Sequence, residues 1–329
     1  MTESTSQETV VHGVVLGGTG GVWQVRTDRG DTVDASIRGR LKKSNSGKRA
    51  DGSLRRDTVS AAATTLKLAV GDDVHLEQDD AGGAWAICEI LPRHSKLARR
   101  APGGGQGERI VAANVDQVIV MFAAAKPDPH PRMLDRFLVI AEGNELPVHI
   151  IINKIDLVGE DVARARFGGY ERIGYPVHYT CVKTGVGLEA LRSVLTGKRS
   201  VVTGPSGVGK SSLLNALFPG ANLRVGAISE SVNKGRHTTV GALMLPLPGD
   251  DGGYVIDTPG LREVGLWAVS VEQLDRCFPE IAALETTCRF GDCRHISEPD
   301  CAVREAVRSG AMTSARYDSY LKLLEELNV

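Results

Sequence analysis

Short alternating apolar and polar runs, separated by glycine, occupy the chain from about residue 10 to residue 93. They read GVVLGG, GVWQVRT, TVDASI, DDVHLEQ and AWAICEIL. Alternation with a period of two residues is typical of strands with one buried face. We therefore predict a small antiparallel β unit at residues 10–93, after a disordered polar tail at residues 1–9. A five-stranded barrel of the OB type fits the length and the pattern, and an SH3-like unit or another small barrel fits nearly as well.

The pattern changes after a Gly-rich basic segment at residues 94–110, which we predict to be a linker. Over residues 111–265, continuous apolar runs such as VDQVIVMFA and VHIIIN alternate with amphipathic helical runs such as PRMLDRFLVIAEGN. Fully apolar strands that alternate with helices predict a parallel sheet covered on both faces, and hence an α/β domain. Residues 266–329 have a helical pattern interrupted by Cys and His, which predicts a small helical domain.

Composition adds the class of protein. The chain has 329 residues, of which 42% are hydrophobic and 24% charged, and its formal net charge is −1. These values are ordinary for a globular protein of two or three domains. No apolar run approaches the roughly 18 residues of a membrane span, and the N-terminus lacks the pattern of a signal peptide. We therefore expect a cytoplasmic protein that has no membrane partner.

Basic residues gather in two segments although the net charge is close to zero. The first holds an insert near residues 43–60 and includes Arg38, Arg40, Lys42, Lys43, Lys48, Arg49, Arg55 and Arg56, and the second contains Arg93, Lys96, Arg99 and Arg100. An isolated basic run is most often a solvated loop. Contact with the phosphate backbone of a nucleic acid is the alternative.

The stretch GPSGVGKS follows the apolar run RSVVT and opens the helical run SSLLNALF. In that context it predicts a loop whose backbone N–H groups surround nucleotide phosphates, rather than a plain Gly-rich turn. Lys210 is expected to reach the β- and γ-phosphates and to assist catalysis, and the Ser211 hydroxyl is expected to hold Mg²⁺. The predicted phosphate-binding residues are Gly204, Pro205, Ser206, Gly207, Val208, Gly209, Lys210, Ser211 and Ser212.

DTPG closes the next apolar run, GGYVI. Asp257 is placed to hold Mg²⁺, and the Gly260 N–H can meet the γ-phosphate. Either Thr238 or Thr239, in the Thr-rich loop before it, can supply a second hydroxyl to Mg²⁺. Many GTPases place a glutamine just after DxxG, but Leu261 stands there and cannot polarise water. The candidate to replace that glutamine is His237, and an exposed loop histidine without a role is the alternative.

The run IIINKIDLV places Asn-Lys-x-Asp directly after an apolar strand. The Asp156 carboxylate can accept hydrogen bonds from the N1–H and 2-amino groups of guanine, which adenine does not offer. Asn153 would bridge to the base and the neighbouring loops, and the Lys154 stem would lie over the ring. The alternative is a helix N-cap. In the later run VHYTCVKTGVG, we assign Cys181 and Val182 to a second base-side loop.

A cluster of three cysteines and one histidine is spaced as Cys288-x4-Cys293-x-His295-x5-Cys301. Three thiolates and an imidazole match a closed tetrahedral Zn²⁺ site without a coordination position for water. In a chain without an export signal, such clustering favours a metal over disulfides. We therefore predict one structural zinc ion.

The segments INKIDL, TGPSGVGKSSLLNAL, KGRHTT, DTPGLREVGLW and CRFGDCRH through EPDCAV together resemble the bacterial ribosome small-subunit-dependent GTPase A family. The resemblance covers nearly the whole chain, in the same order of motifs. It implies an N-terminal OB-fold, a central GTPase domain with circularly permuted motif order, and a C-terminal zinc-binding domain. It also implies hydrolysis of GTP to GDP and phosphate, stimulated by the 30S ribosomal subunit late in its maturation, with His237 assisting.

The resemblance also implies contact with 16S rRNA, which makes the basic segments candidates for that contact, and we expect a monomer that uses Mg²⁺ with GTP. Two other functions stay open from the residues. One is an RNA-binding assembly module whose nucleotide site is a static ligand pocket, against which the complete Lys210, Ser211 and Asp257 set argues. The other is a P-loop ATPase or nucleoside kinase, against which Asn153 and Asp156 argue.

Overall fold

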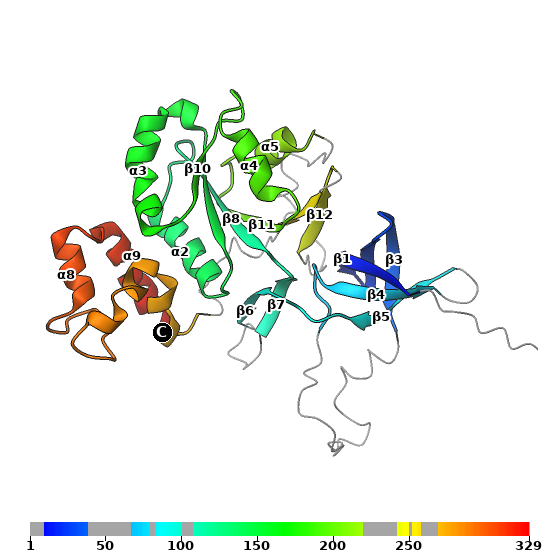
Figure 1. Cartoon of the computed structure of the whole chain (residues 1–329), viewed down its shortest axis with the longest axis horizontal. Coiled ribbons are helices and arrows are strands. Elements are labelled where there is room, and N and C mark those ends of the chain that lie inside the picture. The colour runs from blue at the N-terminus through cyan, green and yellow to red at the C-terminus, as the bar shows by residue number, and fades with distance from the viewer. Residues whose placement is uncertain are drawn as a thin grey trace, which may run out of the picture.

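The structure is a computed structural model that describes residues 10–38, 67–78, 83–100, 108–219, 242–249, 252–257 and 269–328. Figure 1 shows an N-terminal barrel, a central sheet with helices on both faces, and a C-terminal helical unit beside the helix α2. Among these residues no helix is both long enough and apolar enough to cross a membrane.

The N-terminal unit is a closed barrel with the strand order β1-β2-β3-β5-β4. Its strands are β1 (Val11–Thr19), β2 (Val22–Thr27), β3 (Thr32–Ile37), β4 (Asp73–Gln78) and β5 (Trp85–Ile90). All pairs are antiparallel except β3 with β5. Val25, Val74 and Leu76 lie in its core, and Val74 and Leu76 occupy alternate positions of β4, as expected when one face of a strand is buried. The predicted five-stranded barrel of the OB type is confirmed.

The sequence led us to expect a linker at residues 94–110, but this segment contains paired strands. It contains β6 (Lys96–Arg100) and the first half of β7 (Glu108–Ala113), and these two strands pair antiparallel. Leu97 and Ala112 are buried between the barrel and the central sheet. The prediction failed because each strand contains only a few apolar residues and the sequence between them is rich in glycine, so arginine and glycine dominate the composition of residues 94–110.

The central sheet has six strands in the order β10-β9-β8-β11-β13-β12. They are β8 (Gln117–Ala123), β9 (Val148–Asn153), β10 (Val177–Tyr179), β11 (Arg199–Thr203), β12 (Leu243–Leu247) and β13 (Gly253–Asp257). Every neighbouring pair is parallel except β12 with β13. The carboxyl ends of β9, β11 and β13 therefore lie on one edge of the sheet, which is where α/β folds of this kind bind ligands.

Helices cover both faces of this sheet. α2 (Pro131–Glu142) and α3 (Glu160–Ile173) pack with Phe122 and Ile152 on one face, whereas α4 (Leu188–Leu195) and α5 (Lys210–Leu217) pack with Met121 and Ile151 on the other. Consecutive strand residues point to opposite faces, so a strand buried on both sides must be apolar throughout. This explains the unbroken apolar runs in the sequence.

The C-terminal unit contains α7 (Pro279–Ala282), α8 (Ala302–Ser309) and α9 (Ser314–Leu327), together with short 3-10 turns that include η5 (Asp275–Cys277). Its core contains Phe278, Ile281 and Tyr320. Val139 of α2 is completely buried in this same core. The unit is therefore packed onto α2 of the central domain.

Candidate nucleotide and metal sites

The phosphate loop connects β11 to α5, and its backbone requires glycine at two positions. Gly204 has φ +136°, and a Cβ there would lie 2.0 Å from the Met121 carbonyl oxygen. Gly209 has φ +99°, and a Cβ there would lie 2.7 Å from the Asn153 side-chain nitrogen. Any other residue would be strained and would clash at both positions. The spacing of the glycines thus serves close packing of the loop on β8 and β9.

Lys210 and Ser211 begin α5 directly behind this loop. The Lys210 side chain is 6% exposed, and its ammonium donates to the carbonyl oxygens of Gly204 (2.8 Å) and Pro205 (2.7 Å). Ser211 is 8% exposed, whereas Ser206, Gly207 and Ser212 lie at the surface. The loop therefore curves around the lysine ammonium at the N-terminus of a helix, an arrangement that attracts phosphate.

Asn153 and Lys154 join the carboxyl end of β9 to the phosphate loop. The buried Asn153 amide donates to the Val208 carbonyl oxygen (2.9 Å) and accepts a hydrogen bond from the Thr180 hydroxyl (3.2 Å). The Lys154 ammonium donates to the Gly207 carbonyl oxygen (2.6 Å). Two residues of the predicted guanine-binding motif thus hold the phosphate loop in position. Their contact with the base itself stays a prediction.

Asp156 follows on a 3-10 turn at the same edge. Its carboxylate accepts hydrogen bonds from the Cys181 thiol (3.3 Å) and the Lys183 ammonium (3.2 Å). These two donors lower the pKa of Asp156. Lys183 was not among the residues predicted from the sequence, although its place in TCVKTG, two residues after Cys181, was the available signal.

In the second base-side loop, the backbone N–H and the thiol of Cys181 both have hydrogen-bond partners within the protein. The Cys181 backbone N–H donates to the Val186 carbonyl oxygen (3.0 Å), and its thiol points at Asp156. Cys181 therefore orients the carboxylate and has no backbone donor left for a base. Val182, which is partly buried, keeps the predicted role of base contact.

Asp257 ends β13 and is in register with Val202 of β11, two residues before the phosphate loop begins. This pairing places its carboxylate at the same sheet edge as Ser211, as a shared Mg²⁺ site requires. His237, Thr238, Thr239 and Gly260, the other sequence-predicted residues of this site, lie outside the described residues.

Cys288, Cys293, His295 and Cys301 form one cluster, in which the ligand atoms lie within 4.8 Å of one another. His295 Nδ1 lies 3.4 Å from the Cys301 sulfur and 3.6 Å from the Cys288 sulfur. Burial and the neighbouring thiols raise the pKa of Cys293 to about 12. Three thiols and one imidazole packed this closely form a donor set that fits a metal ion, which would hold the sulfurs as thiolates.

The backbone holds His295 in the orientation that this cluster needs. The residue is 1% exposed and has φ +59°, which a non-glycine residue adopts only when its surroundings fix it. Its carbonyl oxygen accepts from the Tyr317 hydroxyl, and its Nε2 lies 3.8 Å from an Asp275 carboxylate oxygen. A carboxylate behind the second ring nitrogen is the usual support of a histidine that ligates metal.

Comparisons with known proteins agree with this geometry. The RsgA GTPase model matches residues 90–267. A "Small ribosomal subunit biogenesis GTPase RsgA" of Gemmatimonas aurantiaca is 56% identical over 99% of both chains. The crystal structure of YjeQ from Thermotoga maritima is 34% identical, with a TM-score of 0.74 over 97% of this chain and 99% of that one.

A second solved structure bears on the order of the motifs. YloQ, described as a circularly permuted GTPase, is 27% identical, with a TM-score of 0.67 over 99% of this chain and 98% of its own. In the present chain the Asn153–Asp156 motif likewise precedes the phosphate loop, while direct hydrogen bonds join the two. The predicted GTPase domain with permuted motif order is thus confirmed, and the chain belongs to the RsgA GTPase family.

Proposed function

We propose that this chain hydrolyses GTP to GDP and phosphate as a factor in late maturation of the 30S ribosomal subunit, and that the subunit stimulates hydrolysis. A relative is named as a GTPase of small ribosomal subunit biogenesis, which supports the 30S subunit as the partner. The observation that carries the chemistry is the direct bonding of Asn153 and Lys154 to the phosphate loop. It brings the predicted guanine-binding motif and the predicted phosphate-binding loop to the same edge of the sheet.

In this proposal, Lys210 moves from the loop carbonyls to the β- and γ-phosphates. Ser211, Asp257 and either Thr238 or Thr239 would hold Mg²⁺, which would supply positive charge to the phosphate oxygens. The Gly260 N–H meets the γ-phosphate. These assignments rest on the sequence motifs, on the burial of Lys210 and Ser211, and on the register of Asp257 with Val202.

Guanine selection belongs to Asp156 in the same proposal. The Cys181 thiol and the Lys183 ammonium hold its carboxylate at the sheet edge, where it accepts from the N1–H and 2-amino groups of the base. An adenine would leave this carboxylate without those partners, which costs about 1–3 kcal/mol or more. Val182 offers its N–H to guanine O6, and the Lys154 stem lies over the ring.

The deciding experiment is release of phosphate from GTP and from ATP, with and without purified 30S subunits. We expect hydrolysis of GTP alone, and faster hydrolysis with the subunits. Asp156→Ala should reduce the preference for GTP over ATP. Absence of hydrolysis would favour the static RNA-binding module, and preference for ATP would favour a P-loop ATPase.

For the Cys/His cluster we propose Zn²⁺, because three thiolates and one imidazole at these distances match its tetrahedral preference. The purified protein should contain about one equivalent of zinc, and Cys301→Ser should lose it and loosen α8 and α9. Full zinc content in that variant would contradict the assignment. The substitution Cys88→Ser, outside the cluster, is the matched control.

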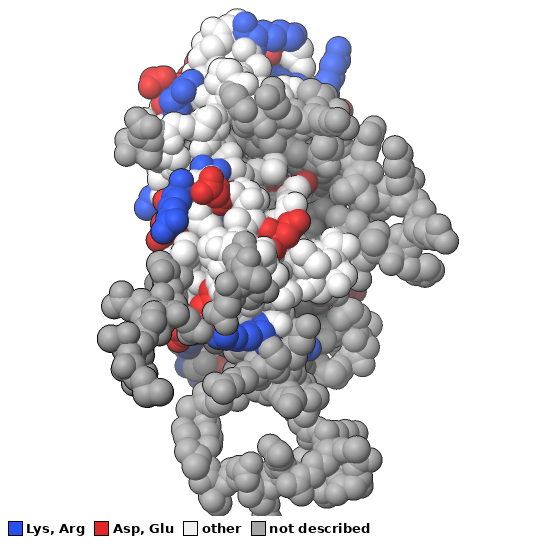
Figure 2. Space-filling model, turned by 90° about the vertical axis from the view of Figure 1, so that its right-hand side faces the viewer, with Lys and Arg blue, Asp and Glu red and all other residues white. Residues whose placement is uncertain are grey.

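We propose contact with 16S rRNA through the basic segments. Figure 2 views the barrel end of the molecule, and there the described Lys and Arg are interspersed with Asp and Glu rather than gathered in one patch. The proposal therefore rests on the insert, which lies outside the described residues, and on the resemblance. Binding to 30S subunits should weaken with salt and on charge reversal at Lys42, Lys43, Lys48 and Arg49. Full binding by that variant would contradict it.

We also propose that the chain is monomeric and that it meets the ribosomal subunit in the cytoplasm.

A further inference from the structure

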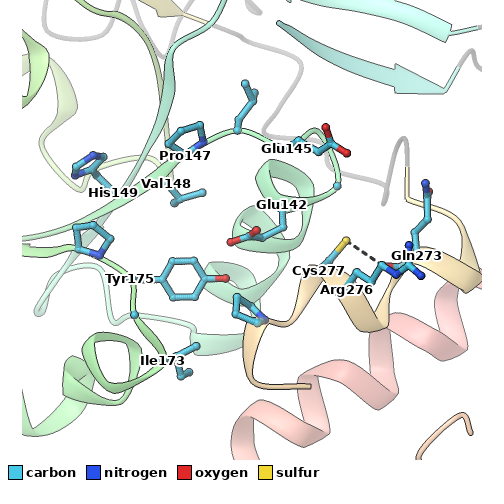
Figure 3. Close-up of a pocket in the computed structure, with 15 residues that line it drawn as sticks. Glu142, Glu145, Pro147, Val148, His149, Ile173, Tyr175, Gln273, Arg276 and Cys277 are labelled. Atoms are coloured by element: carbon cyan, nitrogen blue, oxygen red, sulfur yellow. Dashed lines mark hydrogen bonds between the residues drawn. The ribbon is translucent and has the colours of Figure 1, made fainter. Parts of the chain in front are cut away.

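The central domain has one junction with the C-terminal unit and another with the barrel. Figure 3 shows the first, where Glu142 and Tyr175 of the central domain and Cys277 of the C-terminal unit line a cavity. This cavity lies beside the start of β9, whereas Asn153 of the nucleotide site is at the other end of that strand. The junction with the barrel is different, because it reaches the strands that hold Asp257 in place.

Strand β1 of the barrel has apolar side chains on both of its faces. Val15 lies in the barrel core, whereas its neighbours Val14 and Leu16 belong to the core of the central domain, together with Met244 and Ile256. Consecutive strand residues point to opposite faces, so β1 packs against its own barrel on one side and against the sheet on the other. Figure 1 shows β1 beside β12, and residues of these two strands are in contact.

The backbone of β1 changes its register where it meets the sheet. Its pairing with β2 shifts between Val15 and Gly17, which makes Leu16 the extra residue of a β-bulge. A Cβ at Gly17 would lie 3.2 Å from a methyl carbon of Leu243 on β12. That distance is shorter than ordinary van der Waals contact, so the glycine allows β1 to approach β12 closely.

The contact with Leu243 is one strand away from the proposed magnesium ligand. β12 is the edge strand of the sheet, and its hydrogen-bonded neighbour there is β13. In that pair Leu243 is in register with Asp257, and Met244 is in register with Ile256. An edge strand has ladder hydrogen bonds on one side only, so packing against β1 supports β12 on its other side.

The barrel also holds the other neighbour of β13. The Asp73 carboxylate on β4 accepts two hydrogen bonds from the Arg199 guanidinium, at 2.7 and 3.0 Å, a paired geometry that fixes both groups. Arg199 begins β11, and β11 pairs with β13 in the register that places Val202 opposite Asp257. β13 therefore lies between two strands that are both attached to the barrel.

We propose that Leu16 is a positioning residue for Asp257, acting through β12. The barrel contributes no magnesium ligand, but it sets the place of a carboxylate that would hold Mg²⁺. Metal sites tolerate shifts of only about 0.2 Å in their ligands, so loss of the support for β12 should weaken magnesium binding more than binding of the base. This inference rests on the proposed GTP site and adds a role for the barrel in it.

The experiment measures the affinity of the full-length protein for a fluorescent, non-hydrolysable GTP analogue, once with excess Mg²⁺ and once with EDTA. The ratio of the two dissociation constants reports how much Mg²⁺ tightens nucleotide binding. We expect Leu16→Ala to reduce this ratio about threefold or more, because residues that pack together are energetically coupled, while the affinity in EDTA stays nearly unchanged. Leu16→Met conserves the side-chain volume and should restore the ratio.

The matched control is Leu76→Ala, which makes the same truncation at a completely buried position of the barrel core. It should lower the stability of the barrel and leave the ratio unchanged. Leu243→Ala should reduce the ratio as Leu16→Ala does. Because Leu243 is 43% exposed, this variant tests the inference even if Leu16→Ala does not fold. In the Asp257→Ala background, Leu16→Ala should cause no further reduction.

Three results would overturn the inference. The first is an unchanged ratio in both Leu16→Ala and Leu243→Ala. The second is an equal reduction in Leu76→Ala, which would mean only a general loss of stability. The third is a further reduction in the Asp257→Ala background, which would mean that the effect bypasses this carboxylate. Phosphate release from GTP is measured separately, so failure of the proposed GTPase is distinguishable from failure of this inference.

Discussion

The side-chain amide of Asn153 donates a hydrogen bond to the backbone carbonyl of Val208, at 2.9 Å. The two residues are 55 positions apart in the sequence, and the first belongs to the motif for the base and the second to the loop for phosphate. Parallel strands need only be adjacent to place their carboxyl ends together. The permuted order of the motifs therefore leaves the geometry of the nucleotide site intact.

Asn153→Ala should weaken GTP and GDP binding by about 10- to 100-fold. The substitution leaves the Val208 carbonyl and the Thr180 hydroxyl without their partner, which costs about 1–3 kcal/mol in a buried site. Equilibrium binding of a fluorescent guanine nucleotide measures the effect. The control is Asn144→Ala, which removes an amide that also donates to a carbonyl, that of Ile140, far from this edge. Equal losses in both variants would contradict the role of Asn153.

His237→Ala should lower GTP turnover by about 10²–10⁴-fold while nucleotide affinity stays nearly unchanged. The reason is that Leu261 occupies the position where a water-orienting glutamine is common, so a nearby base must replace it. Turnover with 30S subunits and affinity should be measured on the same preparation. His94→Ala, which removes an exposed histidine elsewhere, should change neither. Unchanged turnover in His237→Ala would rule out this role.

Arg316→Met should lower the free energy of unfolding by about 3–5 kcal/mol, because it leaves the buried carboxylates of Asp135 and Glu280 without their cation. Tyr170 also donates to Asp135, so the damage should reach α3 of the central domain. Urea unfolding and hydrogen exchange of the α3 amides measure the two effects. In contrast, Arg308→Met removes an exposed pair with Glu305 and should cost less than about 1 kcal/mol.

The stacked rings of His149 and His178 should make stability depend on pH. Burial lowers the pKa of both from the ordinary value of 6.5, and the neighbouring His178 ring lowers the pKa of His149 further. The unfolded chain then binds more protons than the folded one near and below pH 6.5, so stability should fall as the pH falls through that range.

The measurement is the urea midpoint between pH 5 and 8 for the unsubstituted protein and for the double variant His149→Gln, His178→Gln. The double variant should show a smaller loss on acidification. At pH 8 both histidines are neutral in both states, so this comparison isolates the packing cost of the substitutions. Equal slopes for the two proteins would show that this pair does not titrate with unfolding.

Local sequence determined the elements that depend on residue periodicity. The alternating runs of the barrel and the continuous apolar strands of the sheet follow from which faces are buried, and both can be read from apolar spacing. The Gly-rich loop could also be predicted locally, because Gly204 and Gly209 have positive φ angles that favour glycine. The Cys/His cluster could be predicted because its four donor residues lie within one short stretch of the sequence.

Tertiary structure decided everything that depends on contacts across the chain. The segment at residues 94–110 became a hairpin because the barrel and the sheet bury its few apolar residues, which a composition of arginine and glycine hides. Arg316 joined Asp135, 181 positions away in the sequence, at a separation that no local pattern reports. Val139 of α2 likewise became part of the core of the C-terminal unit, which its own helix pattern does not report. Sequence spacing fixes which face a side chain occupies, whereas its partner is set by the packing of distant elements.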